Sequence, residues 1–371
     1  MSRFLFVVPP LVGHVNPTVG VAAELTARGH SVAWAGHRDT VRSLVDGQVF
    51  DCAAVDLVRG PSLAGPAAFR FLWEDFLLPL AAAMTPGVRT AIESFGPDVV
   101  VADQQTVAGG LIAEELGLPW VTSATTSAEL IDPLSGMPKV KAWLSTRIDS
   151  LRGGPGPDPQ MSPHGVLAFT TRELIGPVDL PANVWLVGPS VEPRPSTSDF
   201  PWEWLSADAP AVLVTLGTAN VEAGHRFLSQ AVLALSRLPV RAVVVDPAAS
   251  LTDVPPNVLV RRHVPQLDLL ARVDAVVCHA GHNTVCESLW HGVPLVVAPI
   301  RDDQPIVAGQ VVDAGAGVRV RFSRATADHL ADAITTVLDP GYRKAATVVG
   351  DSFRAAGGAP RAADHLEKVY L

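Results

Sequence analysis

The feature that most constrains the fold is the alternation of short apolar runs with longer amphipathic ones. Residues 3–10 read RFLFVVPP, a run that is apolar almost throughout and rich in strand-forming residues. Strands that are apolar on both faces are typical of parallel sheets covered by helices. The following segment, NPTVGVAAELTARGH, has apolar residues at helical spacing and a glycine, Gly29, where a helix should end. With another apolar run at residues 31–36, this stretch predicts a β-α-β unit.

The same alternation recurs along the chain, with one interruption. Apolar runs at residues 97–103 and 118–124 flank a helical pattern, whereas residues 188–201 are rich in proline and serine without any apolar period. Such a composition is typical of a linker. Alternation restarts with AVLVTLGT at residues 211–218. The predicted organisation is a first domain at 1–189, a linker at 190–202, a second domain at 203–355, and a carboxyl-terminal helix at 356–371 as a candidate to pack back on the first domain.

Both predicted domains are α/β, each a Rossmann-like, doubly wound parallel sheet. A chain of 371 residues is long enough for two domains, since one domain usually takes ~100–200 residues. Ligands of doubly wound sheets bind at the carboxyl ends of the strands. Two such domains in tandem therefore predict a cleft between them.

Composition narrows the classes of partner. Hydrophobic residues make up 48% of the chain and charged residues 18%, as in a well-buried globular protein. The formal net charge of -9 argues against nucleic acid as the main partner, because phosphate binding needs a basic face. No run reaches the ~18 apolar residues that a transmembrane helix needs. The apolar start is interrupted by Pro9, Pro10 and His14, which favours a buried strand over a signal peptide.

Cysteine and histidine spacing argues against a metal site. Cys52, Cys278 and Cys286 are widely spread, which predicts buried thiols, no disulfide framework and a cytoplasmic location. His279 and His282 lie three residues apart, but no cysteine or carboxylate cluster completes a ligand set. The sequence also lacks a D-x-D motif. We therefore expect no metal and no cofactor.

A polar turn interrupts the apolar sequence of the second domain. AVVCHAGHNTVCESL, residues 275–289, reads as a strand, a turn and a helix, with His279, Gly281, Asn283 and Thr284 at the turn and the helix start. A helix N-terminus has free N–H groups and a partial positive charge, so it binds phosphate. A glycine lets the backbone approach a ligand closely. Asn283 or Thr284 could instead be a simple N-cap, and the stretch alone leaves both readings open.

HAGHNTVCE at residues 279–287 and PIRDDQP at residues 299–305 resemble the donor-binding signature of the family-one, GT-B-fold glycosyltransferases, which use nucleotide-sugars. That family includes bacterial antibiotic and macrolide, carotenoid and plant secondary-product enzymes. GHVNP, PDVVVAD, VLVTLGT and VPQLDLL stand in the family's order, so the resemblance covers nearly the whole chain. It implies a GT-B fold, with two Rossmann-like domains facing a cleft. The implied reaction moves a sugar from a UDP- or dTDP-sugar to a hydroxyl of a small hydrophobic acceptor, such as a natural product.

Position by position, the resemblance implies a donor site on the second domain. It assigns the diphosphate to Thr218, His279, Gly281, Asn283 and Thr284, the ribose to Glu287, the sugar hydroxyls to Asp303 and Gln304, and the base to Val264 and Gln266. Many relatives have a tryptophan immediately before V-P-Q, where this chain has His263. Because imidazole is a smaller stacking platform, base recognition should depend more on the Val264 backbone. The choice between uracil and thymine stays open.

A histidine and a carboxylate are predicted at one edge of the first sheet. His14 follows the first strand and Asp103 ends the strand VVVAD, so both face the carboxyl edge. Such a pair is a general base whose tautomer and basicity are set by the carboxylate. His14 alone could also cap the first helix. In the family, the matching pair deprotonates the acceptor hydroxyl, and one displacement inverts the anomeric centre while hydrogen bonds and a helix dipole stabilise the leaving diphosphate.

Acceptor-binding residues are expected in the first domain. Residues 69–84 carry Phe71, Trp73, Phe76 and Met84, and residues 122–144 read as an irregular segment with apolar spots. Both segments could line an apolar pocket, although the same aromatic residues could simply pack in the core. Residues 151–160, rich in glycine and proline, read as a mobile lid.

Two other functions fit parts of the sequence. A GT-B nucleotide-sugar epimerase would not need His14 as an acceptor base, and a non-catalytic helper protein would not need an intact pair of His14 and Asp103. A Rossmann dehydrogenase is disfavoured because no strand is followed by G-x-G-x-x-G with a downstream carboxylate. The chain could be a monomer or a homodimer.

Overall fold

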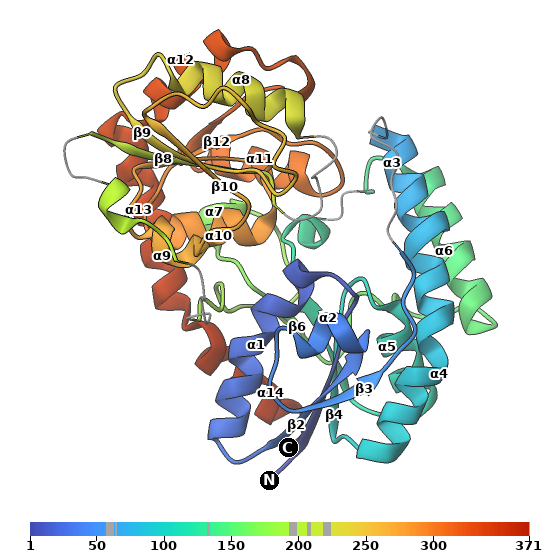
Figure 1. Ribbon diagram of the computed structural model, residues 1–371. Helices are drawn as coiled ribbons and strands as arrows, with labels where there is room; N and C mark the ends of the chain where they lie inside the picture. Colours follow the sequence, from blue (N-terminus) through green and yellow to red (C-terminus); the bar gives the residue numbers. More distant parts are fainter. Residues whose placement is uncertain are drawn as a thin grey trace. The chain divides into compact units, whose positions relative to one another are not determined.

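The computed structural model describes residues 1–56, 63, 65–131, 134–192, 199–205, 209–217 and 224–370. The chain forms two compact units (Figure 1). Unit 1 comprises Met1–Thr170, Val178–Glu192 and Ala355–Leu371, and unit 2 comprises Thr171–Pro177 and Pro193–Arg354. A short segment of the predicted first domain thus belongs to unit 2, and the carboxyl-terminal residues belong to unit 1. Residues 193–198 of the predicted linker lie outside the described residues.

Unit 1 is built on a seven-stranded parallel sheet of order β3-β2-β1-β4-β5-β6-β7. Every residue of β4 and β5 is buried, as their apolar sequences predict for central strands with both faces covered. The strand order reverses between β1 and β4, so this sheet edge is where a ligand should bind. The strands are β1 (Arg3–Val7), β2 (Ser31–Gly36), β3 (Gln48–Asp51), β4 (Val99–Asp103), β5 (Trp120–Ala124), β6 (Val166–Ala168) and β7 (Val184–Leu186).

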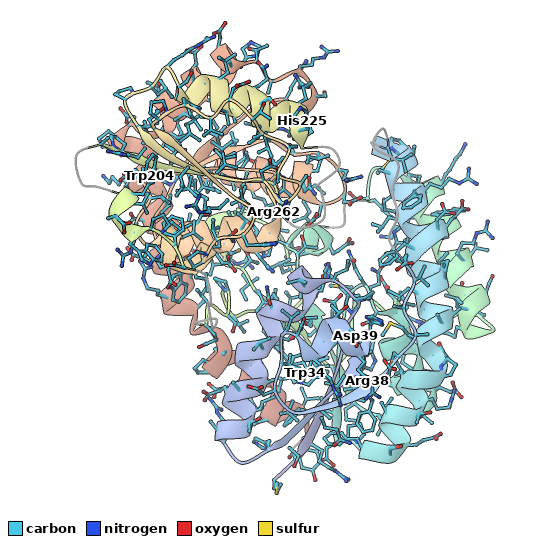
Figure 2. All side chains as sticks on the ribbon, viewed as in Figure 1. Trp34, Arg38, Asp39, Trp204, His225 and Arg262 are labelled. Carbon is cyan, nitrogen blue, oxygen red and sulfur yellow. The ribbon has the colours of Figure 1, made fainter. Side chains whose placement is uncertain are left out.

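Helices cover both faces of this sheet. On one face α1 and α14 lie side by side (Figure 1). They cover a core that includes Trp34, labelled in Figure 2. The Trp34 ring stacks on that of Phe6 at 4.9 Å. The other face is covered by α4, α5 and their neighbours. The helices of unit 1 are α1 (Val12–Ala27), α2 (Arg38–Arg42), α3 (Gly65–Phe71), the π-helix η1 (Leu72–Leu77), α4 (Leu78–Phe95), α5 (Val107–Glu115), the 3-10 helix η2 (Ala128–Ile131), α6 (Pro138–Arg152) and α14 (Gly358–Tyr370).

Unit 2 repeats the plan with a six-stranded parallel sheet of order β10-β9-β8-β11-β12-β13. Its strand order reverses between β8 and β11. The two sheets bear out the predicted α/β fold of two doubly wound domains. The strands are β8 (Ala211–Thr215), β9 (Arg241–Val245), β10 (Val258–Arg261), β11 (Ala275–Cys278), β12 (Leu295–Val297) and β13 (Gly317–Arg319). The helices are α7 (Arg172–Ile175), η3 (Trp202–Trp204), α8 (His225–Leu235), α9 (Gln266–Leu270), α10 (His282–Trp290), α11 (Gln304–Asp313), η5 (Phe322–Arg324), α12 (Ala327–Val337) and α13 (Pro340–Ala356).

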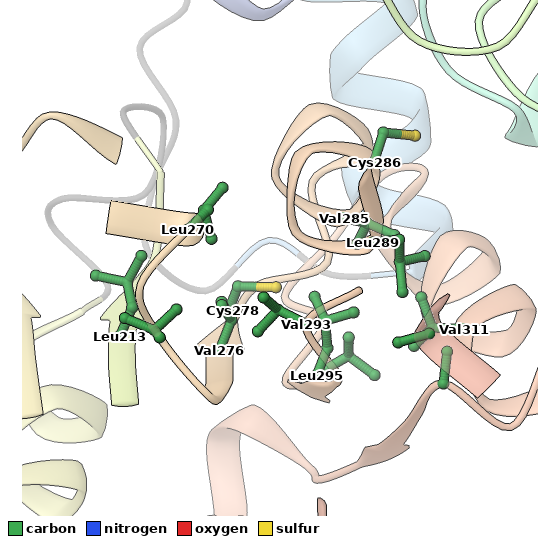
Figure 3. Packing of buried hydrophobic residues seen from close by; sticks show 14 of the residues in the cluster. Leu213, Leu270, Val276, Cys278, Val285, Cys286, Leu289, Val293, Leu295 and Val311 are labelled. Carbon is green, nitrogen blue, oxygen red and sulfur yellow. The ribbon is translucent and has the colours of Figure 1, made fainter. Parts of the chain in front are cut away.

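Apolar side chains from β11, α10, β12 and α11 fill one core of unit 2, which holds Val276, Leu289, Leu295 and Val311 in place (Figure 3). The three cysteines are free and buried, which confirms the prediction of buried thiols. Burial raises the pKa of Cys278 to about 12, so this thiol stays protonated. No helix in the described part of the chain is long and apolar enough to cross a membrane.

Candidate active site

The first group of polar residues lies at the carboxyl edge of the unit 1 sheet. Asp103 is the last residue of β4, as predicted. His14 differs from the prediction, since α1 begins at Val12 and places His14 in the first helical turn instead of the preceding loop. The sequence suggested a later start because the apolar helical spacing was read from Asn16 onward. Leu11, with an extended backbone, precedes the helix instead.

His14 and Asp103 are in direct contact. The Nδ1 atom of His14 lies 3.0 Å from each carboxylate oxygen of Asp103. The Asp103 side chain is completely buried, while that of His14 keeps 18% of its surface exposed. A carboxylate at Nδ1 holds that proton in place and leaves the basic lone pair on Nε2. This arrangement is what a general base requires.

Thr125, which is absent from the sequence-based prediction, completes the cluster. Its hydroxyl donates to Asp103 Oδ2 at 2.8 Å and lies 2.7 Å from His14 Nδ1. The backbone N–H of Gln105 donates to Asp103 Oδ1 at 2.8 Å. These bonds satisfy a buried carboxylate and fix its orientation. Its position in the chain could have indicated this role. Thr125 directly follows β5, the neighbour of β4, and therefore reaches the same sheet edge as Asp103.

The four predicted acceptor residues separate into different environments. Phe76 and Met84 are fully buried in the core beneath α4, so they serve packing. Phe71 is half-buried. Trp73, in the π-helix, lines a cavity of about 510 Å³ within unit 1. Apolar side chains from Phe69, Leu130, Leu144, Ile148 and Met161 and polar ones from Lys141, Asp149, Arg152 and Gln160 also line this cavity.

Two segments beside this cavity differ from their predictions. Residues 138–152, partly assigned to an irregular segment, form helix α6, which begins with a proline at its first position. The predicted lid at 151–160 is anchored to the sheet at its last residue, Gln160. Gln160 donates from Nε2 to the Gln104 carbonyl at 2.9 Å, and its own carbonyl accepts from Thr122 Oγ1 at 3.0 Å. These contacts hold the carboxyl-terminal end of the segment against β5.

The second group of polar residues lies at the turn between β11 and α10 in unit 2. Gly281 is the N-cap of α10 and makes no side-chain cap, so Asn283 and Thr284 lie inside the first turn and neither is the cap. The capping alternative therefore does not explain their presence. Thr218, assigned to the same phosphate region, lies outside the described residues.

The His279 ring fits into a slot between two glycines. A Cβ atom on Gly281 would lie 2.4 Å from His279 Nε2, and one on Gly217 would lie 2.7 Å from Cε1. Both glycines are therefore required by close approach to this ring. Ala280, between His279 and Gly281 in the turn, has a φ of 65°, which is unusual for a residue other than glycine.

His279 is neutral at physiological pH. Burial, reinforced by the positive charge of Arg301, lowers its pKa to about 4. Its Nδ1 atom is buried and has no hydrogen-bond partner. A neutral imidazole can donate one N–H to an anion but adds no charge of its own. Any net positive charge in this turn must come from the helix dipole or from another side chain.

The remaining predicted donor residues gather at the same carboxyl edge. Gln266, the first residue of α9, donates from Nε2 to Glu287 Oε2 at 2.7 Å, and Glu287 is buried. His263 is exposed and Val264 half-buried. Asp303 is the N-cap of α11.

Gln304 has a role that its sequence position did not show. Its Oε1 accepts from the backbone N–H groups of Ile300 at 2.9 Å and Arg301 at 3.2 Å. The side-chain carbonyl therefore holds the loop after β12, and only the amide NH₂ can face a ligand. Across the described residues, no group of three or more His, Cys, Asp or Glu side chains could hold a metal ion.

Two doubly wound units, one with a histidine in contact with a buried carboxylate and one with a polar turn before a helix, match the arrangement expected of a GT-B enzyme. Residues 234–367 match the family model described as "Erythromycin biosynthesis protein CIII-like, C-terminal domain". The chain is 30% identical over 417 residues to 4'-demethylrebeccamycin synthase of Lentzea aerocolonigenes, with 99% of each chain covered.

Solved structures agree. The glycosyltransferase of kitacinnamycin superposes with a TM-score of 0.79 at 27% identity, covering 99% of this chain and 98% of its own. The glycosyltransferase VinC, solved in complex with dTDP, shares the fold with a TM-score of 0.75 at 22% identity, covering 99% of both chains.

The chain belongs to the GT-B-fold glycosyltransferases of natural-product biosynthesis, which confirms the resemblance seen in the sequence. It is a nucleotide-sugar-dependent glycosyltransferase. The named relatives do not favour the epimerase or helper alternatives.

Proposed function

We propose that this enzyme transfers a sugar from a UDP- or dTDP-sugar to a hydroxyl of a small hydrophobic acceptor, with inversion at the anomeric carbon. The observation that carries the proposal is the contact between His14 and the buried Asp103. It lies beside the strand reversal of the unit 1 sheet, where doubly wound folds bind ligands. An epimerase has no acceptor hydroxyl to deprotonate and therefore no need for this pair.

In the proposed mechanism, His14 Nε2 takes the proton of the acceptor hydroxyl. The Asp103 carboxylate at Nδ1 stabilises the imidazolium that forms, and Thr125 keeps that carboxylate oriented. The acceptor oxygen forms a bond to the anomeric carbon as the bond from that carbon to the diphosphate breaks. A single displacement of this kind inverts the configuration, so an α-linked donor gives a β-glycoside.

The donor is proposed to bind unit 2. The N-terminus of α10 and the His279 ring face the diphosphate, Glu287 accepts from the ribose, and Asp303 with the Gln304 amide NH₂ holds the sugar. The bond from Gln266 to Glu287 supports this assignment because it orients the carboxylate. Binding of dTDP by VinC supports a thymidine or uridine diphosphate. No step needs a metal ion, since helix dipole and hydrogen bonds stabilise the leaving charge.

The acceptor is proposed to bind unit 1. The cavity beside Trp73 has a mixed lining and a volume in the usual range for a small-molecule site, ~300–1,000 Å³. Its apolar wall supports a hydrophobic acceptor, while Lys141, Asp149 and Arg152 would suit polar substituents at its rim.

A panel of UDP- and dTDP-sugars, each incubated with a diverse acceptor library, tests the proposal. We expect glycosides by mass spectrometry, with nucleoside diphosphate released in equal amount. Interconversion of the sugar without any acceptor would instead identify an epimerase, and binding without turnover a helper protein. Repeating the assay with EDTA tests metal independence: complete loss of turnover, restored by magnesium, would overturn that part.

A further inference from the structure

Arg301 is a buried cation that the proposed mechanism does not yet use. It lies in the loop between β12 and α11, and only 8% of its surface is exposed. A guanidinium stays charged at any physiological pH, and burying it is costly unless negative groups lie nearby. Such a residue needs an explanation in terms of the charges that it meets.

The fold places Arg301 at the same sheet edge as His279. Strands β11 and β12 are parallel neighbours, with Cys278 opposite Val297. The N–H of Ala298 donates to the Cys278 carbonyl at 2.8 Å, so the two loops leave the sheet together. His279 and Arg301 are the first and fourth residues after this paired edge.

The loop that carries Arg301 is held in a defined conformation. The Gln304 side chain accepts from the backbone N–H groups of Ile300 and Arg301. The next residue, Asp302, has a φ of 56°, a left-handed conformation that favours glycine. Strained backbone of this kind persists where surrounding contacts fix it, and it is common at ligand-binding sites.

The charges of the turn fit an anion. Arg301 is near enough to contribute to lowering the pKa of His279, which is therefore neutral. The buried Nδ1 atom of His279 has no partner, and the N-terminus of the nine-residue helix α10 begins three residues later. The exposed Asp302 and the half-buried Asp303 are the acidic residues on the Arg301 loop. A permanent cation, a neutral N–H donor and a helix N-terminus together match a phosphate group.

We infer that Arg301 binds the diphosphate of the donor and supplies positive charge at the sheet edge that carries His279 and the N-terminus of α10. This inference rests on the proposed function, because it deepens the donor site on unit 2. The charge on the diphosphate increases as the bond to the sugar breaks. Arg301 should therefore stabilise the leaving group more than the intact donor, which raises turnover as well as affinity.

Ligand size separates this role from a structural one. The experiment titrates two series of ligands at fixed ionic strength: uridine, UMP and UDP, and then thymidine, dTMP and dTDP. The proteins compared are the wild type, Arg301→Gln, Arg301→Lys and Arg321→Gln. Calorimetry suits the nucleotides and ligand-observed NMR the nucleosides. Arg321→Gln is the matched control, since it removes the same charge from an exposed position of unit 2.

We expect Arg301→Gln to bind the diphosphate about 10- to 100-fold more weakly while nucleoside binding stays unchanged, as for loss of one charged hydrogen-bonding partner. Arg301→Lys should fall between, and Arg321→Gln should resemble the wild type. An equal loss for nucleoside and diphosphate, or no loss for either, would overturn the role of Arg301. If Arg301→Gln does not fold, Arg301→Lys decides the question by the same comparison.

The same titration separates the inference from the proposed function. A wild type that binds neither UDP nor dTDP refutes both. A wild type that binds one of them, with Arg301 variants that match it, refutes only the role of Arg301. Turnover gives a further check, because Arg301→Gln should lower kcat as well as raise KM for the donor.

Discussion

At the scale of single residues, the two halves of the chemistry rely on opposite electrostatic designs. The Asp103 side chain is completely buried and lies 3.0 Å from His14 Nδ1, while Arg301 is a buried cation whose charge helps to lower the pKa of His279. In the proposed mechanism, the same side-chain type is a base in unit 1 and a neutral hydrogen-bond donor in unit 2. The surroundings of each ring decide its role.

The pair in unit 1 should behave as one catalytic group. His14→Ala is expected to lower turnover by about 10²–10⁴-fold, the usual range for a positioned general base. Asp103→Asn keeps the shape but removes the charge that supports the imidazolium, so it should lose most of the same activity. The double variant should be little worse than His14→Ala, because residues that act as a unit are not additive.

Steady-state rates on an alcohol acceptor test this prediction as a double-mutant cycle. The four proteins are the wild type, His14→Ala, Asp103→Asn and the double variant. Thr125→Val is a useful companion, since it removes the hydroxyl that orients Asp103. Losses that multiply, or a His14→Ala enzyme with near wild-type turnover, would mean that the base lies elsewhere. A phenol or thiol acceptor would be a poor choice, because its lower pKa reduces the need for a base.

The neutral state of His279 makes a separate prediction about pH. Its pKa is lowered to about 4 in the folded protein, below the unfolded value near 6.5. Between these values the unfolded chain binds more protons, so this residue stabilises the fold above pH 6.5 and that contribution is lost as pH falls toward 4. His279→Gln should flatten the stability curve in this window.

Urea unfolding at pH 7, 6, 5 and 4 measures the effect. Nucleoside diphosphate affinity should also fall in His279→Gln at pH 7, while in the wild type this residue should cause no change in affinity between pH 6 and 8. Parallel stability curves for variant and wild type would show that His279 is not the buried neutral group described.

At the scale of secondary structure, strands were more predictable than helix limits. The runs VVVAD and AVVC indicate buried parallel strands because both faces of each strand are apolar. The π-helix η1 and the start of α1 could not be read, because both depend on packing against the sheet more than on local preference. β13 has only three residues, too few for any period to show.

The candidate site residues also divide into those that the sequence could place and those that it could not. Asp103, which ends β4, and His279, which directly follows β11, could be placed from the pattern alone. Thr125 and Arg301 could not, because their roles depend on which strands become neighbours. The bond between Gln304 and its own loop is equally invisible in sequence.

The slot around His279 makes a prediction at this scale. Gly281→Ala should displace the ring, since the new Cβ would meet Nε2 at 2.4 Å, whereas the φ of -63° at this position accepts alanine without strain. Nucleoside diphosphate affinity should therefore fall about 10-fold or more, with a stability loss of about 1–3 kcal/mol from overpacking. Calorimetry and thermal unfolding measure the two effects.

Gly309→Ala is the matched control. Gly309 lies within α11, and a Cβ there would have no neighbour within 4 Å. Alanine favours a helix over glycine by about 1 kcal/mol, so this variant should be slightly more stable with unchanged affinity. If Gly281→Ala binds the diphosphate as tightly as Gly309→Ala does, the slot is not part of the donor site.

At the scale of the whole molecule, both chain ends belong to unit 1. Helix α14 lies on α1, where Arg28 contacts Asp364 at 2.8 Å and Glu367 at 3.0 Å, and His365 stacks on Trp185 at 4.5 Å. Gly357, which precedes this helix, and Gly358, its first residue, both have positive φ and let the chain turn into it. The carboxyl terminus thus completes the core of the unit that begins the chain.

This organisation predicts where a carboxyl-terminal substitution is felt. Leu366 is fully buried in α14 and packs in the same core as Phe4, Leu25 and Val99. Leu366→Ala should cost about 2–5 kcal/mol, as for other buried leucines, and the loss should appear in unit 1. Arg28→Ala should cost less, about 1 kcal/mol at most, because its ion pairs are partly exposed.

Hydrogen exchange should accelerate in β1 and β4 of the Leu366→Ala protein while β8 and β11 stay protected, since stability is not uniform across a structure. Tyr370→Ala, at a 51% exposed position of the same helix, is the control and should leave both sheets unchanged. Faster exchange in β8 and β11 alone would mean that α14 stabilises unit 2, contrary to the contacts that it makes with α1.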